Sequence, residues 1–229
     1  MTPHKHPETW ITPSEGGIAF SHYRKTFDFP GEFIDDAHAR YAHAPPSGLI
    51  EVGIPGWLRV ADALKLYEMA YFSQGQVLEI GAYHGLSTSI LALALRNAGR
   101  GHTLVSLELD PPAMLEAKRN VADLAEMCDF ILGDARVSRG ELKEQGRTFA
   151  FAFVDHSHMY ELVRDACVDL KKLIRPGGFA LFHDFNDPRN GKDSQYGVYQ
   201  AVVETFADET FVFHGVYGCA ALYRRSTSV

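Results

Sequence analysis

Two segments rich in acids and histidines each follow a short apolar run. Residues 155–158 read Asp-His-Ser-His, and residues 183–187 read His-Asp-Phe-Asn-Asp. If the two apolar runs are parallel strands of one sheet, both segments emerge at the same edge of that sheet. A carboxylate and an imidazole placed there can assist the loss of a proton from a reacting group near neutral pH. We therefore take His158 and Asp155 as candidate catalytic residues.

A glycine-containing turn lies earlier in the chain. Residues 77–88 read Val-Leu-Glu-Ile-Gly-Ala-Tyr-His-Gly-Leu-Ser-Thr, an apolar run that leads into a Leu- and Ala-rich segment. Gly81 permits a sharp turn, and Gly85 removes a side chain where a helix must pack closely. Ser87 and Thr88 place hydroxyls beside free helix N–H groups, which favours an anion. The pattern Gly-x-Gly-x-x-Gly is not met, and this disfavours a nicotinamide dehydrogenase.

Two more acids follow the next apolar runs. Glu108 ends one of them, where a carboxylate can accept both hydroxyls of a ribose, and Asp134 follows another, where it can accept from an adenine amino group. Taken singly, Glu108 also fits a solvated acid and Asp134 a helix cap. Together with the turn glycines, and in order along the chain, these acids predict a binding site for a nucleoside-containing cofactor.

A sheet flanked by helices is the frame that would bring these residues together. Nearly continuous apolar runs predict buried parallel strands at 76–80, 103–107, 128–132, 150–154 and 179–182. Helices fill the gaps, and the clearest, at 160–174, ends at the Arg-Pro-Gly-Gly of 175–178. This alternation predicts a Rossmann-like, doubly wound α/β sheet in a three-layer sandwich. The chain would close with a helix at 196–206 and an antiparallel hairpin of 210–214 and 219–224 around a turn at 215–218.

The glycine-containing turn resembles the cofactor-binding motif of class I S-adenosylmethionine-dependent methyltransferases. Its Glu-Ile-Gly-Ala-Tyr-x-Gly-x-Ser most resembles the catechol O-methyltransferase branch, and the similarity extends over about residues 51–185. The resemblance implies that Glu108 binds the ribose and that Asp134 lies beside the adenine. It also implies that the turn holds the methionine end of the cofactor, while Glu79 braces the loop or meets the ammonium group. The implied cofactor-binding residues are Glu79, Gly81, Tyr83, Gly85, Ser87, Glu108, Asp134 and Asp155.

The two acid–histidine segments resemble those of bacterial methyltransferases of the macrocin O-methyltransferase and cephalosporin hydroxylase type. In metal-dependent O-methyltransferases, the acids that correspond to Asp155 and Asp184 bind Mg²⁺, which lowers the pKa of a substrate hydroxyl. His158 stands where the catechol enzymes have a lysine base. The third metal ligand stays open between His183, Asn186 and no metal at all, because imidazole is softer than Mg²⁺ favours. His158 also fits a helix cap, and His183 a residue that orients Asp184.

Composition excludes several classes of function. The 229 residues carry a net charge of −7, so no broad cationic surface can neutralise a nucleic acid or an anionic membrane. The three cysteines, Cys128, Cys167 and Cys219, are far apart in apolar runs and predict buried thiols in a reduced, cytoplasmic protein. No segment has the pattern of a secretion signal or a membrane span. Within residues 1–13, His4 and His6 are expected to be solvated.

The expected organisation is an N-terminal arm and one catalytic domain. Residues 1–56 are rich in proline and predict a loop-rich arm or lid, with residues 33–57 as the part that could cover the site. Residues 57–229 predict the methyltransferase domain. We expect O-methylation of a small molecule, with a divalent cation as an open question and a homodimer as the commonest assembly. The alternatives are N-methylation, hydroxylase-type chemistry, or a nucleotide-binding domain without turnover.

Overall fold

The computed structural model describes residues 23–45 and 47–227. Within them, seven strands form one sheet in the order β3-β2-β1-β4-β5-β7-β6. Strands β1 to β5 are parallel, and β7 lies antiparallel between β5 and β6. The Rossmann-like sheet and its closing hairpin, both predicted above, are thus confirmed. The strands are β1 (Val77–Ile80), β2 (Leu104–Glu108), β3 (Cys128–Leu132), β4 (Phe149–Val154), β5 (Ile174–Phe182), β6 (Phe211–Tyr217) and β7 (Ala220–Arg225).

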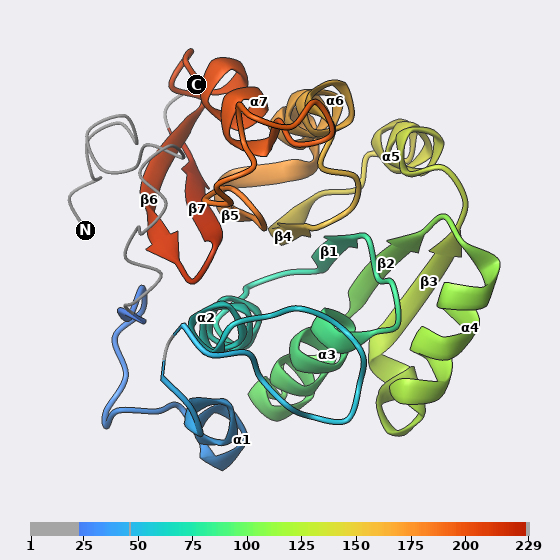
Figure 1. Cartoon of the computed structure of the whole chain (residues 1–229). Coiled ribbons are helices and arrows are strands. Elements are labelled where there is room, and N and C mark those ends of the chain that lie inside the picture. The colour runs from blue at the N-terminus through green and yellow to red at the C-terminus, as the bar shows by residue number, and fades with distance from the viewer. Residues whose placement is uncertain (1–22, 46, 228–229) are drawn as a thin grey trace.

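Helices cover both faces of the sheet, so the molecule has three layers (Figure 1). One face carries α2 (Val60–Tyr71), α3 (Leu86–Ala98) and α4 (Pro111–Asn120), and the other carries α5 (Ala135–Glu144), α6 (Tyr160–Leu173) and α7 (Val198–Thr205). The described helices include none that is long and apolar enough to cross a membrane.

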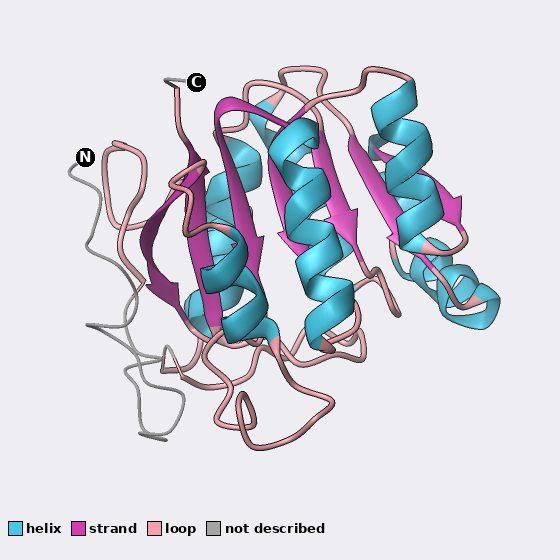
Figure 2. Ribbon diagram, turned by 90° about the horizontal axis from the view of Figure 1, so that it is seen from above, coloured by secondary structure: helices cyan, strands magenta, loops and turns pink. Residues whose placement is uncertain are grey.

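The central strands are apolar throughout because both of their faces are buried. In β4, Ala152 and Val154 belong to the core beneath α6 and α7, whereas Phe151 and Phe153 belong to the core beneath α2 and α3. This arrangement leaves the carboxyl ends of the parallel strands at one edge of the sheet. Long loops gather at that edge (Figure 2).

Two predicted strand boundaries were wrong, and a register shift beside a glycine-containing segment explains each of them. Strand β5 begins directly after α6 at Ile174 and not at Phe179, because the β4–β5 ladder shifts register there and accommodates residues 175–178 within the strand. Strand β6 runs through the predicted turn to Tyr217, because Gly215, with φ of 143°, absorbs a second register shift. The hairpin turns at residues 218–219 instead.

The described part of the arm is better ordered than its proline content predicts. It contains α1 (Asp36–Ala39), whose N-terminus is capped by the Asp35 side chain, and a 3₁₀ helix at Arg40–Ala42. Leu49 forms a bridge with Arg59, and Tyr41 is buried in the core beneath α2. His4, His6 and the rest of residues 1–22 lie outside the described residues.

Candidate active site

A cavity of about 730 Å³ opens at the carboxyl ends of β1, β4 and β5. Ligand pockets commonly have this size. Four parts of the chain line it: residues 49 and 55–59 of the arm and its junction, the turn after β1, the loops after β4 and β5, and Cys219 between β6 and β7. Among the arm aromatics, Trp57 lines the cavity and is 72% exposed, whereas Tyr41 packs against α2 instead. The part of the predicted lid that reaches the cavity is therefore short.

The turn after β1 brings backbone close to the other two loops. Gly81 has a φ of 101°, and a Cβ there would overlap the backbone of Asp155. Gly85, with a φ of 89°, lies against Ala117 of α4, as predicted for a close helix contact. Between these glycines, Tyr83 adopts a φ of 47° and its ring stacks on His84 at a centroid distance of 3.8 Å. The turn is compact because only glycine fits at its two ends.

Glu79 braces this turn from below. It is fully buried in β1 and accepts hydrogen bonds from the hydroxyls of Ser87 (2.6 Å), Thr88 (2.7 Å) and Ser106 (2.5 Å). Burial raises the pKa of Glu79 to about 7, and the three hydroxyls oppose that rise. Of the two roles considered for Glu79, the structure places it in the bracing one. The hydroxyls of Ser87 and Thr88 are therefore directed at Glu79, while the anion site at the free N–H groups beside them stays a prediction.

Glu108 and Asp134 occupy different surroundings. The Glu108 carboxylate accepts N–H groups of Tyr83 (2.7 Å), Leu109 (2.8 Å) and Asp110 (2.9 Å), so it is held beside the turn. Asp134 caps the N-terminus of α5 and pairs with Arg136, whose hydrogen bonds lower the pKa of Asp134 to about 2. Neither acid is among the residues that line the cavity itself.

His158 and Asp184 form a short polar contact between the loops after β4 and β5. Nε2 of His158 lies 2.8 Å from Oδ2 of Asp184. Burial alone would raise the pKa of Asp184, but hydrogen bonds from His158 and His183 outweigh it and lower that pKa well below its usual range. Tyr196 stacks on one face of the His158 ring, with a centroid distance of 4.6 Å and an interplanar angle of 6°. The guanidinium of Arg189 in turn lies 3.8 Å over the Tyr196 ring.

His183 is buried, with Asp155 and Asp184 near one ring nitrogen and Cys219 and Asp62 near the other. Its Nδ1 lies 3.2 Å from Oδ1 of Asp155 and 3.6 Å from Oδ2 of Asp184. Its Nε2 lies 3.0 Å from Sγ of Cys219 and 3.7 Å from Oδ2 of Asp62. Burial disfavours a charged imidazole, but the nearby carboxylates outweigh burial and raise the pKa of His183 well above its usual value. All three cysteines are free thiols; Cys167 and Cys219 are buried, as predicted, whereas Cys128 is only half-buried. Cys219 is more than a small buried hydrophobe, because it contacts this imidazole.

The predicted metal ligands are only partly brought together. Asp155 and Asp184 meet as expected, and His158 joins them, since one ligand atom from each lies within 4.8 Å of the others. The Asn186 side chain is buried, does not line the cavity and has no hydrogen-bond partner among the described residues.

Four residues that line or support the site were missed in the sequence. Tyr196 and Arg189 lie in the loop after β5, which has no recognisable pattern. Asp62 lies in the apolar pattern of α2, and Cys219 lies in the closing hairpin. The backbone N–H of Cys219 donates to Asp62 at 2.9 Å across 157 residues of sequence, a contact that no local signal predicts.

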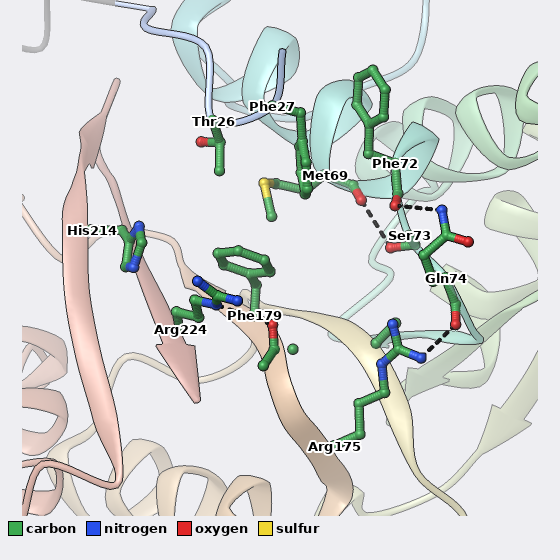
Figure 3. A pocket seen from close by; sticks show the side chains of 13 residues that line it. Thr26, Phe27, Met69, Phe72, Ser73, Gln74, Arg175, Phe179, His214 and Arg224 are labelled. Carbon is green, nitrogen blue, oxygen red and sulfur yellow. Dashed lines mark hydrogen bonds between the residues drawn. The ribbon is translucent and has the colours of Figure 1, made fainter. Parts of the chain in front are cut away.

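A second cavity, of about 300 Å³, lies at the opposite end of the same strands (Figure 3). Phe27, Phe72 and Phe179 form apolar walls, and Arg175 donates to the carbonyl of Gln74 at 2.6 Å. No carboxylate is among its lining residues in the described chain. It therefore lacks the acid–imidazole pairs of the first cavity.

Comparison with known families bears on the region between the turn and the second acid–histidine segment. Residues 78–185 match a family model described as a methyltransferase domain. This region is a methyltransferase domain. It holds all of the residues predicted to bind cofactor or to catalyse, whereas Tyr196, Cys219 and Asp62 lie outside the matched part of the chain.

Individual relatives agree with the assignment of this methyltransferase domain. A fatty-acid O-methyltransferase from Mycolicibacterium smegmatis is 29% identical over 154 residues, which are 63% of this chain and 50% of the relative. The chain therefore spans about half the length of that curated relative.

Solved structures share the fold along nearly the whole chain. An O-methyltransferase from Bacillus cereus in complex with SAH has a TM-score of 0.61 at 19% identity, covering 96% of this chain and 99% of that one. The O-methyltransferase TomG from Streptomyces achromogenes, in complex with SAM, has a TM-score of 0.59 at 19% identity, covering 97% and 100%. At such identities the likeness shows the fold of the methyltransferase domain.

Proposed function

We propose that this protein transfers a methyl group from S-adenosylmethionine to an oxygen atom of a small-molecule acceptor, with His158 as the general base. The observation that carries the proposal is the His158–Asp184 pair, which lines a cavity that the glycine turn after β1 also lines. The turn belongs to the matched methyltransferase domain, and the pair supplies the proton acceptor that methylation of a hydroxyl requires.

The cofactor fits the surroundings of the turn. The cavity has room for a nucleoside-sized ligand, and the backbone at Gly81 and Gly85 leaves no side chain in the way. Glu108, held beside Tyr83, is placed to bind a ribose hydroxyl with the lone pair of Oε2 that its three N–H contacts leave open. When bound, S-adenosylmethionine supplies a methyl group that an oxygen nucleophile can attack in line with the departing sulfur.

The protein's own residues would orient the acceptor and remove its proton. Asp184 holds Nε2 of His158, so Nδ1 is the ring nitrogen that takes the proton from the acceptor hydroxyl. The stack of Tyr196 on one face of the imidazole limits its rotation. We assign Asp155, which contacts His183 at the same edge, a supporting role in the acceptor site.

A divalent cation is the second arrangement that the same residues support. Asp155, His158 and Asp184 offer one ligand atom each within 4.8 Å, a set that fits a cation with mixed oxygen and nitrogen ligands. Such an ion would lower the pKa of an acceptor hydroxyl. The ion would also bind the side chains that form the His158–Asp184 contact. His158 therefore cannot both bind the ion and act as the free general base.

Calorimetric titration tests the cofactor assignment. We expect S-adenosylmethionine and S-adenosylhomocysteine to bind with micromolar affinity. Glu108→Ala should weaken binding by tenfold or more, because a ribose contact to a charged acceptor is worth about 1.5–3 kcal/mol. His158→Ala should leave cofactor binding unchanged and lower turnover. The reverse pattern, or no binding of either compound at millimolar concentration, would contradict the proposal.

The acceptor and the cation are tested by turnover. A panel of hydroxylated small molecules and fatty acids should be screened with EDTA and again with Mg²⁺ or Mn²⁺. Fatty acids are included because one relative is a fatty-acid O-methyltransferase. An ether product resists mild alkali, whereas a methyl ester, as expected from a fatty-acid acceptor, is hydrolysed. Turnover that persists in EDTA supports the free base, and turnover that requires Mg²⁺ supports the cation.

A further inference from the structure

A compact group of three side chains lies directly behind the His158–Asp184 pair. Asp62, His183 and Cys219, here called the buried cluster, are all shielded from solvent, and each offers one ligand atom to a common centre. They come from the first turn of α2, the end of β5 and the turn between β6 and β7. None of the proposed steps of methyl transfer uses Asp62 or Cys219.

The separations within the buried cluster match those of ligands around one ion. Nε2 of His183 is 3.0 Å from Sγ of Cys219 and 3.7 Å from Oδ2 of Asp62, and the sulfur and that oxygen are 3.6 Å apart. The point equidistant from these three atoms lies about 2 Å from each, close to the zinc–ligand distances of about 2.0–2.3 Å. A thiolate, an imidazole and a carboxylate are also the ligand types that zinc accepts.

An independent observation concerns the far side of the imidazole. Histidines that bind a metal through one ring nitrogen almost always turn the other toward a carboxylate or carbonyl. Nδ1 of His183 lies 3.2 Å from Oδ1 of Asp155, although their geometry does not make a hydrogen bond among the described residues. A carboxylate is thus close to the far side of the imidazole, and Nε2 lies on the side of Cys219 and Asp62.

The surrounding backbone fixes the other two ligands. Asp62 accepts the N–H groups of Arg59 and Cys219, each at 2.9 Å, and a Cβ at Gly218 would overlap the Asp62 carboxylate. The carboxylate is thus held against the hairpin turn. Zinc would bind the thiolate of Cys219 and the neutral imidazole of His183, so both side chains give up their protons as the ion enters.

We propose that Asp62, His183 and Cys219 bind one zinc ion, with the fourth coordination position directed toward the large cavity. His183 and Cys219 both line that cavity, which gives the ion access to water or to a bound ligand. Through His183, the ion holds Asp155 in place at the acceptor side of the site. This site differs from the Asp155, His158 and Asp184 group, which contains no sulfur and would suit a harder cation.

Cobalt substitution of the full-length protein tests the site. The protein is stripped of metal, one equivalent of Co²⁺ is added, and the spectrum is recorded. We expect a thiolate-to-cobalt charge-transfer band and tetrahedral d–d bands. Both should be lost in Cys219→Ser and reduced in Asp62→Asn. They should persist in Cys167→Ser, a matched change of a buried cysteine in α6, and in Asp184→Asn, which removes a carboxylate of the other group and no ligand of the buried cluster.

Zinc retention gives a second readout that does not depend on activity. The stripped wild-type protein, given zinc and passed through gel filtration, should retain about one equivalent, and its Tm should rise. Cys219→Ser should retain at least tenfold less and show no rise in Tm, while its circular dichroism shows that it is folded.

Two results would overturn the proposal: zinc retention below a tenth of an equivalent in the wild type, or a charge-transfer band that survives Cys219→Ser. The cofactor titration is unaffected by either result, so failure of the zinc site and failure of the methyltransferase proposal are distinguishable.

Discussion

Two residues at the edge of the cavity, Tyr83 and Asp184, adopt backbone angles that side chains rarely take. Their φ values are 47° and 52°, and each follows the end of a central strand. Non-glycine residues in this region cost about 1–3 kcal/mol unless the surroundings hold them there. Asp184 is held by His158, and Tyr83 by the Glu108 carboxylate that accepts its N–H. Each strained residue therefore contacts a side chain to which we assign a function: His158 as the base and Glu108 in cofactor binding.

Glu79 gives a pH-dependent prediction at the same scale. Because burial raises its pKa from 4.5 to about 7, the folded protein binds a proton more tightly than the unfolded chain. Stability should therefore fall as the pH rises from about 4.5 to 7, by up to about 3 kcal/mol from this residue. Glu79→Gln should remove this loss. The free energy of unfolding of the variant, relative to that of the wild type, should therefore be higher at pH 8 than at pH 5.

Urea unfolding at the two pH values measures the Glu79 effect. Glu116→Gln is the matched control, because it makes the same chemical change at an exposed acid of α4. The control should shift the pH dependence by no more than a few tenths of a kcal/mol. Equal pH profiles for Glu79→Gln and the wild type would contradict the assignment of a raised pKa.

At the scale of elements, the β1–α3 turn is positioned by contacts with two neighbours. One end touches the loop after β4 at Gly81, and the other touches α4 at Gly85. Glu79 links the strand to the first turn of α3 and to Ser106 in β2. The turn is therefore fixed to the sheet before any ligand binds, and a preformed site loses less entropy on binding.

Gly81→Ala should destabilise the protein by at least about 1–3 kcal/mol, because the new Cβ is strained at φ of 101° and overlaps the backbone of Asp155. It should also weaken cofactor binding, since the turn must move. Gly99→Ala is the control: Gly99 also has a positive φ, 62°, but has open space around it, so the cost should be about 1 kcal/mol with no effect on binding. Thermal unfolding and calorimetry measure both. Equal costs for the two variants would show that the close approach at Gly81 is unimportant.

For the whole molecule, helix α2 joins the arm to the active site. Asp62, Lys65 and Glu68 recur every third residue of α2 and are all fully buried. Asp62 contacts Cys219, whereas Lys65 and Glu68 pair with each other and bind arm residues 24–27. The arm and the site are thus connected by one row of polar side chains inside the protein.

Lys65→Met tests how strongly the arm is attached. Removing one partner leaves Glu68 buried without its countercharge, so we expect a loss of about 3–5 kcal/mol in unfolding free energy. The amide hydrogens of Thr26 and Phe27, which bond to Glu68, should exchange faster. Arg119→Met, which breaks an exposed pair with Glu116, should cost less than about 1 kcal/mol. A small cost for Lys65→Met together with unchanged exchange at Thr26 would contradict this account.

The sequence by itself determined the layers of the fold and most of the residues around the cavity. Continuous apolar runs located the five parallel strands, and acids and glycines at their ends located the site, because parallel strands bring their carboxyl ends to one edge. The His158–Asp184 pair follows from that rule, although the sequence left the partner of each residue open.

Only the tertiary structure decided which side chains support that pair. Asp62 and Cys219 meet because β7 inserts antiparallel between β5 and β6, and a pairing across 157 residues leaves no mark on local periodicity. The same holds for the bulges in β5 and β6, where register depends on the neighbouring strand. Local sequence fixes which face of an element is apolar, but the contacts between elements arise only when those faces are packed together.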